Sequence, residues 1–314
     1  MRYALSLSYN GAPFSGWQIQ NGAPTVQETL EHALSTLLRT AVAVTGAGRT
    51  DAGVHAADYL AHFDAPDGAV ADPVLLACKL NAILPRSVVV HSVVPVPPEF
   101  HARFDARRRE YTYFLHRRKD PFMDAFSWLC GYPGLDFEAM NAACAHLLGT
   151  HDFSCFEKTG GNSKTSICTV CEAFWAPYIP THLAVMAYGS ATPDRCREGV
   201  AGEIAGEAAS MAADGAAGTA GEMASGAAGA ATGRAKDGAC GYVTDSREPE
   251  YWYFRISADR FLRNMVRAVT GTLIDIGRGK HDPAWIADLM ATGTRSDAGE
   301  SVPGHALFLS KVRY

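Results

Sequence analysis

Alternating apolar and polar residues predict that the chain begins with a half-buried strand. Tyr3, Leu5, Leu7 and Tyr9 alternate with alanine and serine, which is the two-residue period of a strand with one face in a core. Runs rich in aromatic and β-branched residues predict further strands along the chain. These runs are residues 42–45, 59–63, 87–94, 110–116, 167–175, 181–188, 251–257 and 307–312.

Apolar residues at helical spacing predict helices between these strands. Residues 25–28 form a capping box, in which the Thr25 hydroxyl and the Glu28 carboxylate can accept from free amides at a helix start. Asp72 followed by Pro73 marks a second start. The predicted helices cover residues 26–38, 72–84, 136–148 and 260–276, with a short one after residue 282. This mixed order indicates an α+β fold, which we divide into domains of residues 1–105 and 106–314.

An alanine- and glycine-rich stretch interrupts the second domain. From residue 201 to residue 240, 25 of 40 residues are alanine or glycine. Frequent glycine opposes helix formation, and such small side chains cannot build a core that offsets the entropy of ordering. We therefore predict a disordered surface insertion over about residues 190–248.

The acidic net charge of the chain does not argue against a nucleic-acid partner. The formal charge is −5, but residues 197–250 alone hold nine acids and four bases, so the rest of the chain is balanced. Within that rest, residues 101–119 carry seven bases against two acids, and residues 255–280 carry six against two. Local excesses of this size attract a phosphate backbone, although a solvated basic face is an equally good interpretation.

Several classes of protein are not expected. No apolar run is long enough to predict a transmembrane helix, and no hydrophobic leader precedes the first strand. The eight cysteines lack an export signal, which favours reduced thiols in the cytoplasm. Cys168 and Cys171 form a CxxC pair that could hold zinc, but in a strand they would point to opposite faces. We expect no metal and no cofactor.

A glycine-rich loop over residues 45–55 carries the candidate chemistry. Its sequence is TGAGRTDAGVH, so Arg49, Thr50 and Asp51 stand together among three glycines. Such a loop can present a carboxylate as a nucleophile or a general base. It can equally be a tight turn closed by an Arg49–Asp51 pair. It is not a phosphate-binding P-loop, because the terminal Gly-Lys-Ser/Thr is absent.

Together with blocks elsewhere, this loop resembles the bacterial tRNA pseudouridine synthase A family. The similar blocks follow in family order and cover nearly the whole chain outside the insertion. They are GAGRTDAGVHA at 46–56, YNG at 9–11, GWQIQ at 16–20, VQ at 26–27, LN at 80–81 and LP at 84–85, FHARF at 100–104, YTY at 111–113 and NMVR at 264–267. The resemblance implies the pseudouridine synthase fold, with two α+β halves around a basic cleft. It also implies a homodimer that needs no cofactor and isomerises uridines 38, 39 and 40 of tRNA.

The resemblance also implies roles for individual residues. Asp51 aligns with the catalytic nucleophile, and Arg267 with the arginine that pairs with it. Arg49 matches the arginine that turns the target nucleotide out of its stack, and Tyr111 the tyrosine that stacks on the flipped uracil and handles its proton. Whether Asp51 attacks the uracil ring or the sugar stays open.

Basic residues of the 101–119 run are expected to contact phosphates without reading base sequence. They are Arg107, Arg108, Arg117 and Arg118. The alternative hypothesis is a catalytically inactive RNA-binding protein or tRNA folding helper on the same scaffold. The presence of Asp51, Tyr111 and Arg267 favours the enzyme.

Overall fold

A computed structural model describes residues 1–160, 165–188 and 249–314. Contacts divide the chain into two units, of which the first comprises Met1–Tyr178 and Pro249–Tyr314 and the second Ile179–Glu248. The predicted insertion at about residues 190–248 lies outside the described residues. In the second unit, the described part contains helix α4 (Thr181–Tyr188). All other elements below belong to the first unit.

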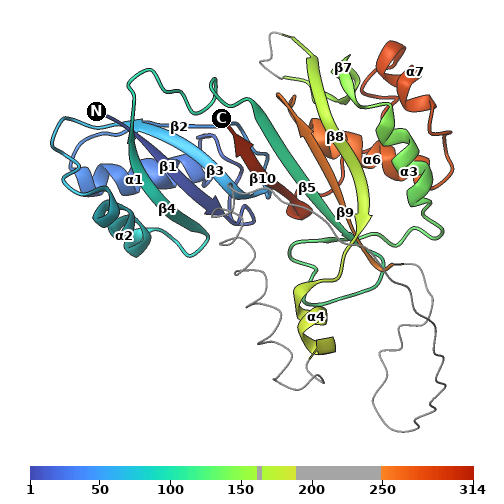
Figure 1. Cartoon of the computed structure of the whole chain (residues 1–314), viewed down its shortest axis with the longest axis horizontal. Helices are drawn as coiled ribbons and strands as arrows, with labels where there is room; N and C mark the ends of the chain where they lie inside the picture. Colours follow the sequence, from blue (N-terminus) through green and yellow to red (C-terminus); the bar gives the residue numbers. More distant parts are fainter. Residues whose placement is uncertain (161–164, 189–248) are drawn as a thin grey trace, which may run out of the picture. The chain divides into compact units, whose positions relative to one another are not determined.

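A single ten-stranded sheet forms the centre of the first unit (Figure 1). Its main path runs in the order β4 (Val88–Val96), β1 (Arg2–Tyr9), β3 (His55–Asp64), β10 (Leu307–Arg313), β5 (Arg108–His116), β9 (Tyr251–Ala258), β8 (Ile167–Pro177) and β7 (Gly149–Asp152). Two short strands, β2 (Val44–Gly46) and β6 (Trp128–Leu129), pair with β3 and β5. The last strand of the chain thus lies in the middle of the sheet, parallel to β3 and antiparallel to β5.

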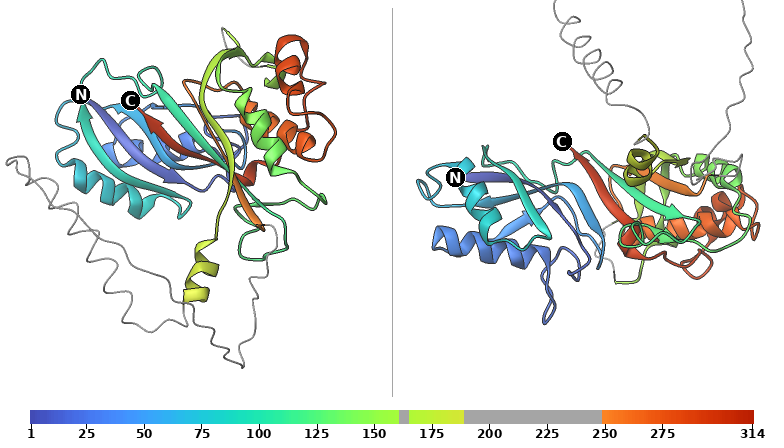
Figure 2. Two further views of the ribbon diagram at one scale, coloured as in Figure 1. Left: turned by 45° about the vertical axis from the view of Figure 1, so that its right-hand side comes forward. Right: turned by 90° about the horizontal axis from the view of Figure 1, so that it is seen from below.

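The helices of the first unit pack against this sheet. They are α1 (Val26–Leu38), α2 (Pro73–Ile83), α3 (Phe137–Ala145), α6 (Met265–Gly277) and α7 (Trp285–Thr292), with short 3-10 turns η1 (Ser154–Phe156) and η2 (Gly304–Ala306). Figure 2 shows α1 and α6 on the same side of the sheet. The almost wholly buried α6 lies against α3, and α2 lies against β4. None of the helices in the described ranges is long and apolar enough to cross a membrane.

Local signals account for where the helices begin. The Thr25 hydroxyl accepts from the amide of Glu28 at 3.4 Å, as the capping box predicts. The Asp72 carboxylate accepts from the amides of Val74 and Leu75 at 2.8 and 3.2 Å. Helix α6 begins five residues later than predicted, because Asn264 adopts a left-handed conformation with φ of 63°.

The predicted strand at 181–188 is wrong, because these residues form α4. The amides of Leu183 and Ala184 both donate to the carbonyl of Pro180 at 3.0 Å, which closes a first helical turn. The stretch contains alanine, leucine and methionine, which favour helix. Local propensity therefore outweighs the apolar run that suggested a strand.

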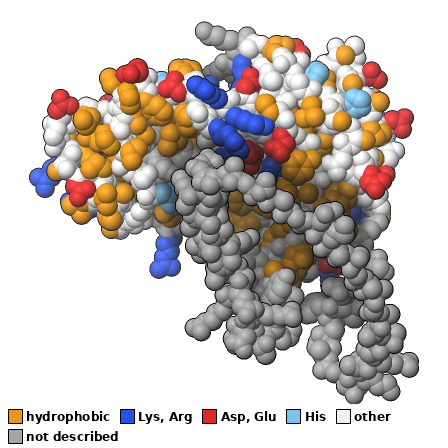
Figure 3. Space-filling view, viewed as in Figure 1, with side chains coloured by type: hydrophobic (Ala, Val, Ile, Leu, Met, Phe, Trp, Pro, Cys, Tyr) orange, Lys and Arg blue, Asp and Glu red, His pale blue; other side chains and the backbone are white. Residues whose placement is uncertain are grey.

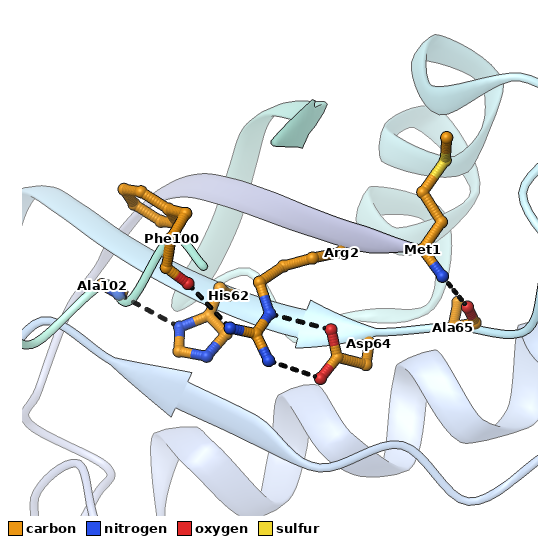
Figure 4. Close-up of polar contacts among 7 residues, drawn as sticks. All are labelled: Met1, Arg2, His62, Asp64, Ala65, Phe100 and Ala102. Carbon is orange, nitrogen blue, oxygen red and sulfur yellow. Dashed lines mark hydrogen bonds and ion pairs between the residues drawn. The ribbon is translucent and has the colours of Figure 1, made fainter. Parts of the chain in front are cut away.

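Arg2 at the start of β1 connects this strand to its neighbours (Figure 4). Its guanidinium donates to both carboxylate oxygens of Asp64 in β3, at 2.9 and 2.8 Å, and to the carbonyl of Phe100 at 2.9 Å. The hydrogen bond from Arg2 lowers the pKa of the Asp64 carboxyl. Arg2 thus joins β1, β3 and the segment that follows β4.

The α+β class is confirmed, and the division at residue 105 stays a prediction. β10 belongs to the C-terminal part of the sequence, yet it pairs with β3 from the N-terminal part. The two predicted halves therefore share one continuous sheet.

Three buried imidazoles, those of His55, His62 and His116, each have a hydrogen-bond partner at Nδ1. The amide of Gly11 donates to Nδ1 of His55 at 3.0 Å, and the amide of Ala102 donates to Nδ1 of His62 at 3.1 Å. Nδ1 of His116 lies 2.9 Å from the hydroxyl of Ser127. Burial is the main cause that lowers the pKa of all three rings.

We therefore expect the free energy of unfolding to fall as pH is lowered below about 6.5, the ordinary histidine pKa. Below that pH the unfolded chain binds protons that the folded chain excludes. The contribution of these rings to the free energy of unfolding is therefore fully present above that pH and decreases below it. Each ring contributes at most about 1.4 kcal/mol per pH unit. Urea unfolding at pH 7.5 and 5.5 measures the difference. His62→Asn should reduce the difference, and equal stability at both pH values would contradict the prediction.

Candidate active site

The loop between β2 and β3 has a backbone that is tied down on several sides. Its hydrogen bonds run from Ala47 N to Leu60 O at 2.8 Å, from Trp17 N to Thr50 O at 3.1 Å and from Gly53 N to Phe14 O at 3.3 Å. The Thr50 hydroxyl lies 2.9 Å from the hydroxyl of Tyr9. The fixed backbone leaves the side chains of Arg49 and Asp51 as the groups that the loop presents.

Two glycines of the motif are required by this geometry. A Cβ on Gly46 would lie 2.1 Å from the Tyr59 hydroxyl and 2.6 Å from the Trp17 ring. Gly53 has φ of 76°, which L side chains rarely adopt. Because Gly46 has no Cβ, the Tyr59 hydroxyl fits against it and donates to the carbonyl of Gly48. Gly46 therefore leaves room for two aromatic side chains at the start of the loop, and Gly53 permits the left-handed turn before β3.

Arg109 of β5 fastens the loop to two other parts of the chain. Its guanidinium donates to Ala47 O through Nε at 3.2 Å and Nη2 at 2.8 Å. It also donates to the carbonyls of Arg103 at 2.7 Å, Ala106 at 3.2 Å and Asp259 at 2.8 Å. Partial burial lowers the pKa of Arg109, and its donors are satisfied by carbonyls alone among the described residues. A planar guanidinium can span four carbonyls in this way, whereas an ammonium cannot.

The carboxylate of Asp51 faces the guanidinium of Arg267. Nη1 of Arg267 lies 3.7 Å from Oδ2 of Asp51, and the two side chains are 22% and 32% exposed. Val302 fixes Arg267 from the other side, because its carbonyl accepts from Nε at 2.7 Å and its amide donates to Arg267 O at 3.2 Å. Arg267 is thus held on α6 with one face of its guanidinium directed at Asp51.

Tyr111 completes the group around Asp51. It lies two residues beyond Arg109 on the same face of β5, and its ring meets Phe261 edge-on at 5.0 Å. Burial raises the pKa of Tyr111 to about 12, with Arg109 opposing and Asp51 adding to the shift. The hydroxyl is therefore protonated at neutral pH. Of the predicted site residues, the structure brings Asp51, Arg267 and Tyr111 together.

Arg49 is exposed, and the described residues offer it neither a carboxylate nor a hydrogen bond. The alternative interpretation of the loop, a turn closed by an Arg49–Asp51 pair, is therefore not what the structure contains. Asp51 pairs with Arg267 instead. Arg49 remains a cation on the loop surface next to the Asp51 carboxylate.

The four arginines predicted to contact phosphates do not form one cluster. Arg107 and Arg108 stand at the start of β5, whereas Arg117 and Arg118 follow its end, about 30 Å away along the strand. Arg108 donates to the Ser257 hydroxyl on the face of β5 opposite Tyr111. Arg117 donates to Tyr132 O at 2.7 Å, and Arg118 lies 3.7 Å from Glu250.

Exposed bases nevertheless gather where β5 begins and β10 ends. Figure 3 shows Lys and Arg side chains on the molecular face over these strand ends. In the register of the sheet, Arg313 lies opposite Arg108, and Lys311 lies opposite Glu110. Arg107 and Arg313 are both exposed there. This end of β5 is the end from which Arg109 reaches the loop.

The CxxC pair has the arrangement expected of a strand. Cys168 is buried and Cys171 is exposed, on opposite faces of β8. Burial raises the pKa of the Cys168 thiol to about 12. Within residues 1–160, 165–188 and 249–314, no three histidine, cysteine or acidic side chains are grouped as a metal site would require.

Comparison with known proteins identifies the family. A family model described as tRNA pseudouridine synthase matches residues 143–314, which is more than half of the chain. The chain belongs to this tRNA pseudouridine synthase family. Its curated relatives named tRNA pseudouridine synthase A include that of Porphyromonas gingivalis, 38% identical over 313 residues that cover 100% of this chain and 97% of the relative. Another, from Parabacteroides distasonis, is 38% identical over 314 residues, or 100% and 96% of the two chains.

A third relative of that name, from Nitratidesulfovibrio vulgaris, is 36% identical over 326 residues, or 100% and 99% of the two chains. The family match contains Arg267, and the matches to the relatives also include the loop with Asp51. The family resemblance inferred from the sequence is confirmed.

Arg109 is the residue that reasoning from sequence missed. In the sequence it stands with exposed arginines in the basic run of residues 101–119. The signal that distinguishes it is spacing, because Arg109 directly precedes the strand predicted over residues 110–116, and extending that strand by one residue places it on the face of Tyr111 and Tyr113. A basic residue two positions before buried tyrosines has its side chain directed toward the core side.

We predict that Arg109→Lys lowers the free energy of unfolding by about 2–4 kcal/mol, because several carbonyls lose their donor. Urea unfolding measures the change. Arg107→Lys is the matched control, since its exposed side chain makes no hydrogen bond within the described part of the chain, and it should stay within about 0.5 kcal/mol of wild type. Equal effects of the two substitutions would show that Arg109 is not a fastening point.

Proposed function

We propose that this chain isomerises uridine to pseudouridine in tRNA, with Asp51 as the nucleophile. The observation that carries the proposal is the Asp51 carboxylate on a fixed loop, 3.7 Å from Arg267 and beside the buried Tyr111. The names of the relatives, tRNA pseudouridine synthase A, support tRNA as the substrate. Uridines 38, 39 and 40 as targets, a homodimeric state and a cytoplasmic location are parts of the proposal that rest on the family resemblance.

The reaction suits the groups that are present. The bond between uracil N1 and ribose C1′ breaks, a bond between uracil C5 and C1′ forms, and the proton of C5 is released while N1 gains one. No electrons are gained or lost overall, and the composition of the nucleotide is unchanged, because the hydrogen lost from C5 is matched by the one gained at N1. A carboxylate that attacks the nucleotide forms a covalent bond to one of the two halves, the uracil ring or the ribose, and is released when the C5–C1′ bond has formed. Arg267 holds this carboxylate in place by charge attraction.

The other residues support access to the target base. A base inside a stack must be turned out before a side chain can reach it, which requires a few kcal/mol. Arg49 is an exposed cation next to Asp51 and is suited to occupy the space that the base leaves. Tyr111 offers an aromatic ring at the site, and stacking recovers about 1–3 kcal/mol per base. Its raised pKa favours stacking and hydrogen-bond donation over removal of a proton at neutral pH.

The alternative of an inactive RNA-binding protein has less support. A protein that only binds RNA does not need a carboxylate facing RNA, since a negative charge there repels phosphates. The structure instead provides Asp51 with an arginine partner and a fixed backbone. This arrangement favours the enzyme.

Asp51→Asn should abolish pseudouridine formation while tRNA still binds. The amide keeps the shape of the side chain but is a poor nucleophile. Pseudouridine in digested tRNA is measured by chromatography, and affinity by a filter-binding titration. We expect activity to fall by at least about 1,000-fold with Kd within about threefold of wild type. Substantial activity in the variant would reject Asp51 as the nucleophile.

Arg267→Ala should lower the rate of the bound complex by about 100-fold and leave the salt dependence of binding unchanged, because its partner is Asp51 and not a phosphate. Arg107→Ala should do the opposite, lowering the slope of log Kd against log salt by about 0.7–0.9 while the bound rate stays normal. Single-turnover rates and titrations at several salt concentrations separate the two. If Arg267→Ala changed the slope and not the rate, Arg267 would be a phosphate contact.

A further inference from the structure

The turn formed by residues 101–105 displays an aromatic ring to solvent beside the candidate active site. The side chain of Phe104 is 74% exposed. Isolated exposed apolar residues are common on proteins and need no explanation by themselves. Phe104 differs because the backbone that carries it is unusually well fixed.

Hydrogen bonds within the turn fix the direction of Phe104. The carbonyl of His101 accepts from the amides of Phe104 at 3.1 Å and Asp105 at 3.0 Å. The His101 ring accepts through Nδ1 from the amides of Arg103 at 3.2 Å and Phe104 at 3.3 Å. The Asp105 carboxylate accepts from the amide of His101 at 2.8 Å. The exposed ring thus stands on a preorganised base.

The turn is also anchored to the sheet. Figure 4 shows His62 of β3 accepting from the amide of Ala102, and Arg2 of β1 donating to the carbonyl of Phe100. The hydroxyl of Tyr314 donates to Ala102 O at 2.7 Å. Two strands and the last residue of the chain therefore hold the turn.

A single nitrogen atom joins this turn to the loop that carries Asp51. Nη2 of Arg109 donates to Arg103 O at 2.7 Å and to Ala47 O at 2.8 Å. Phe104 is the next residue after Arg103, and Asp51 is four residues after Ala47. The exposed ring and the carboxylate therefore stand on backbones that share one guanidinium.

The surroundings of the ring are basic and aromatic. The guanidinium carbon of Arg103 lies 5.9 Å from the centroid of the Phe104 ring, and the His101 ring lies 4.2 Å from it. Arg103 and Arg49 are both exposed on the two connected segments. The Asp105 carboxylate in this turn already accepts the His101 amide. An exposed flat ring with an exposed guanidinium beside it is suited to bind an unpaired base and its phosphate.

We propose that Phe104 stacks on an unpaired nucleobase next to the target uridine, while Arg103 contacts the phosphate of that nucleotide. This inference rests on the proposed function, because it names how the same site recognises its RNA. The contact is to a base that does not react, so it contributes to binding and not to the chemical step.

Substitutions at position 104 test stacking directly. Phe104→Leu keeps an apolar side chain but removes the ring, so Kd for tRNA should rise about 5- to 150-fold. Phe104→Trp keeps a stacking surface and should bind at least as tightly as wild type. The single-turnover rate at saturating tRNA should stay within about threefold of wild type in both. Filter-binding titrations and single-turnover pseudouridine formation give the two quantities.

Salt dependence distinguishes stacking from charge. Phe104→Leu removes no charge, so the slope of log Kd against log salt should be unchanged, whereas Arg103→Ala should lower it by about 0.7–0.9. Phe122→Leu is the matched control, because Phe122 is 73% exposed and lies beyond the far end of β5. Its Kd should equal that of wild type.

The outcomes separate this inference from the proposed function. If wild type forms no pseudouridine, the proposed function fails. If wild type is active and Phe104→Leu binds tRNA as tightly as wild type does, the stacking proposal is wrong. A change in oligomeric state on sedimentation with unchanged Kd would assign the ring to a protein contact and also overturn the proposal.

Discussion

The site depends on one partly buried guanidinium, that of Arg109, whose hydrogen bonds within the described part of the chain all go to backbone carbonyls. Arg109 holds the carbonyls of Ala47, Arg103, Ala106 and Asp259, so it fixes the start of the Asp51 loop, the turn that carries Phe104 and the end of β9. A carboxylate partner would have occupied donors that here reach four carbonyls. Because the backbone is held in this way, and Thr50 is the loop side chain that contacts Tyr9, neither Asp51 nor Arg49 is needed to support the loop. Asp51 and Arg49 therefore remain available for a substrate.

The central position of the last strand brings distant parts of the sequence to this site. β10 pairs with β3, which follows the Asp51 loop, and with β5, which carries Arg109 and Tyr111. The segment before β10 contributes Val302, which holds Arg267, and His305, whose carbonyl lies 2.9 Å from Nε2 of His55 at the start of β3. The ion pair between Asp51 and Arg267 is thus supported by the strand order of the sheet.

Much of the fold could be predicted because its signals are local. Alternation in β1 and the caps at Thr25 and Asp72 depend on neighbouring residues, and the structure contains them. The strand predicted at 181–188 is wrong because a short apolar run fits either helix or strand. In the site, the glycine-rich motif indicated Asp51, and the family resemblance indicated its pairing with Arg267. Spacing places the Arg109 side chain on the face of Tyr111, but its partners could not be predicted, since they are carbonyls, which leave no trace in side-chain identity.

The most direct test follows the hydrogen that the proposed reaction must release from uracil C5. Transfer RNA labelled with tritium at uracil C5 is incubated with wild type and with Asp51→Ala, and tritium in water is counted over time. The account predicts that wild type releases tritium in proportion to the pseudouridine formed, and that Asp51→Ala releases none above background. Equal release by the two proteins, or no release by wild type on tRNA that it binds, would contradict it.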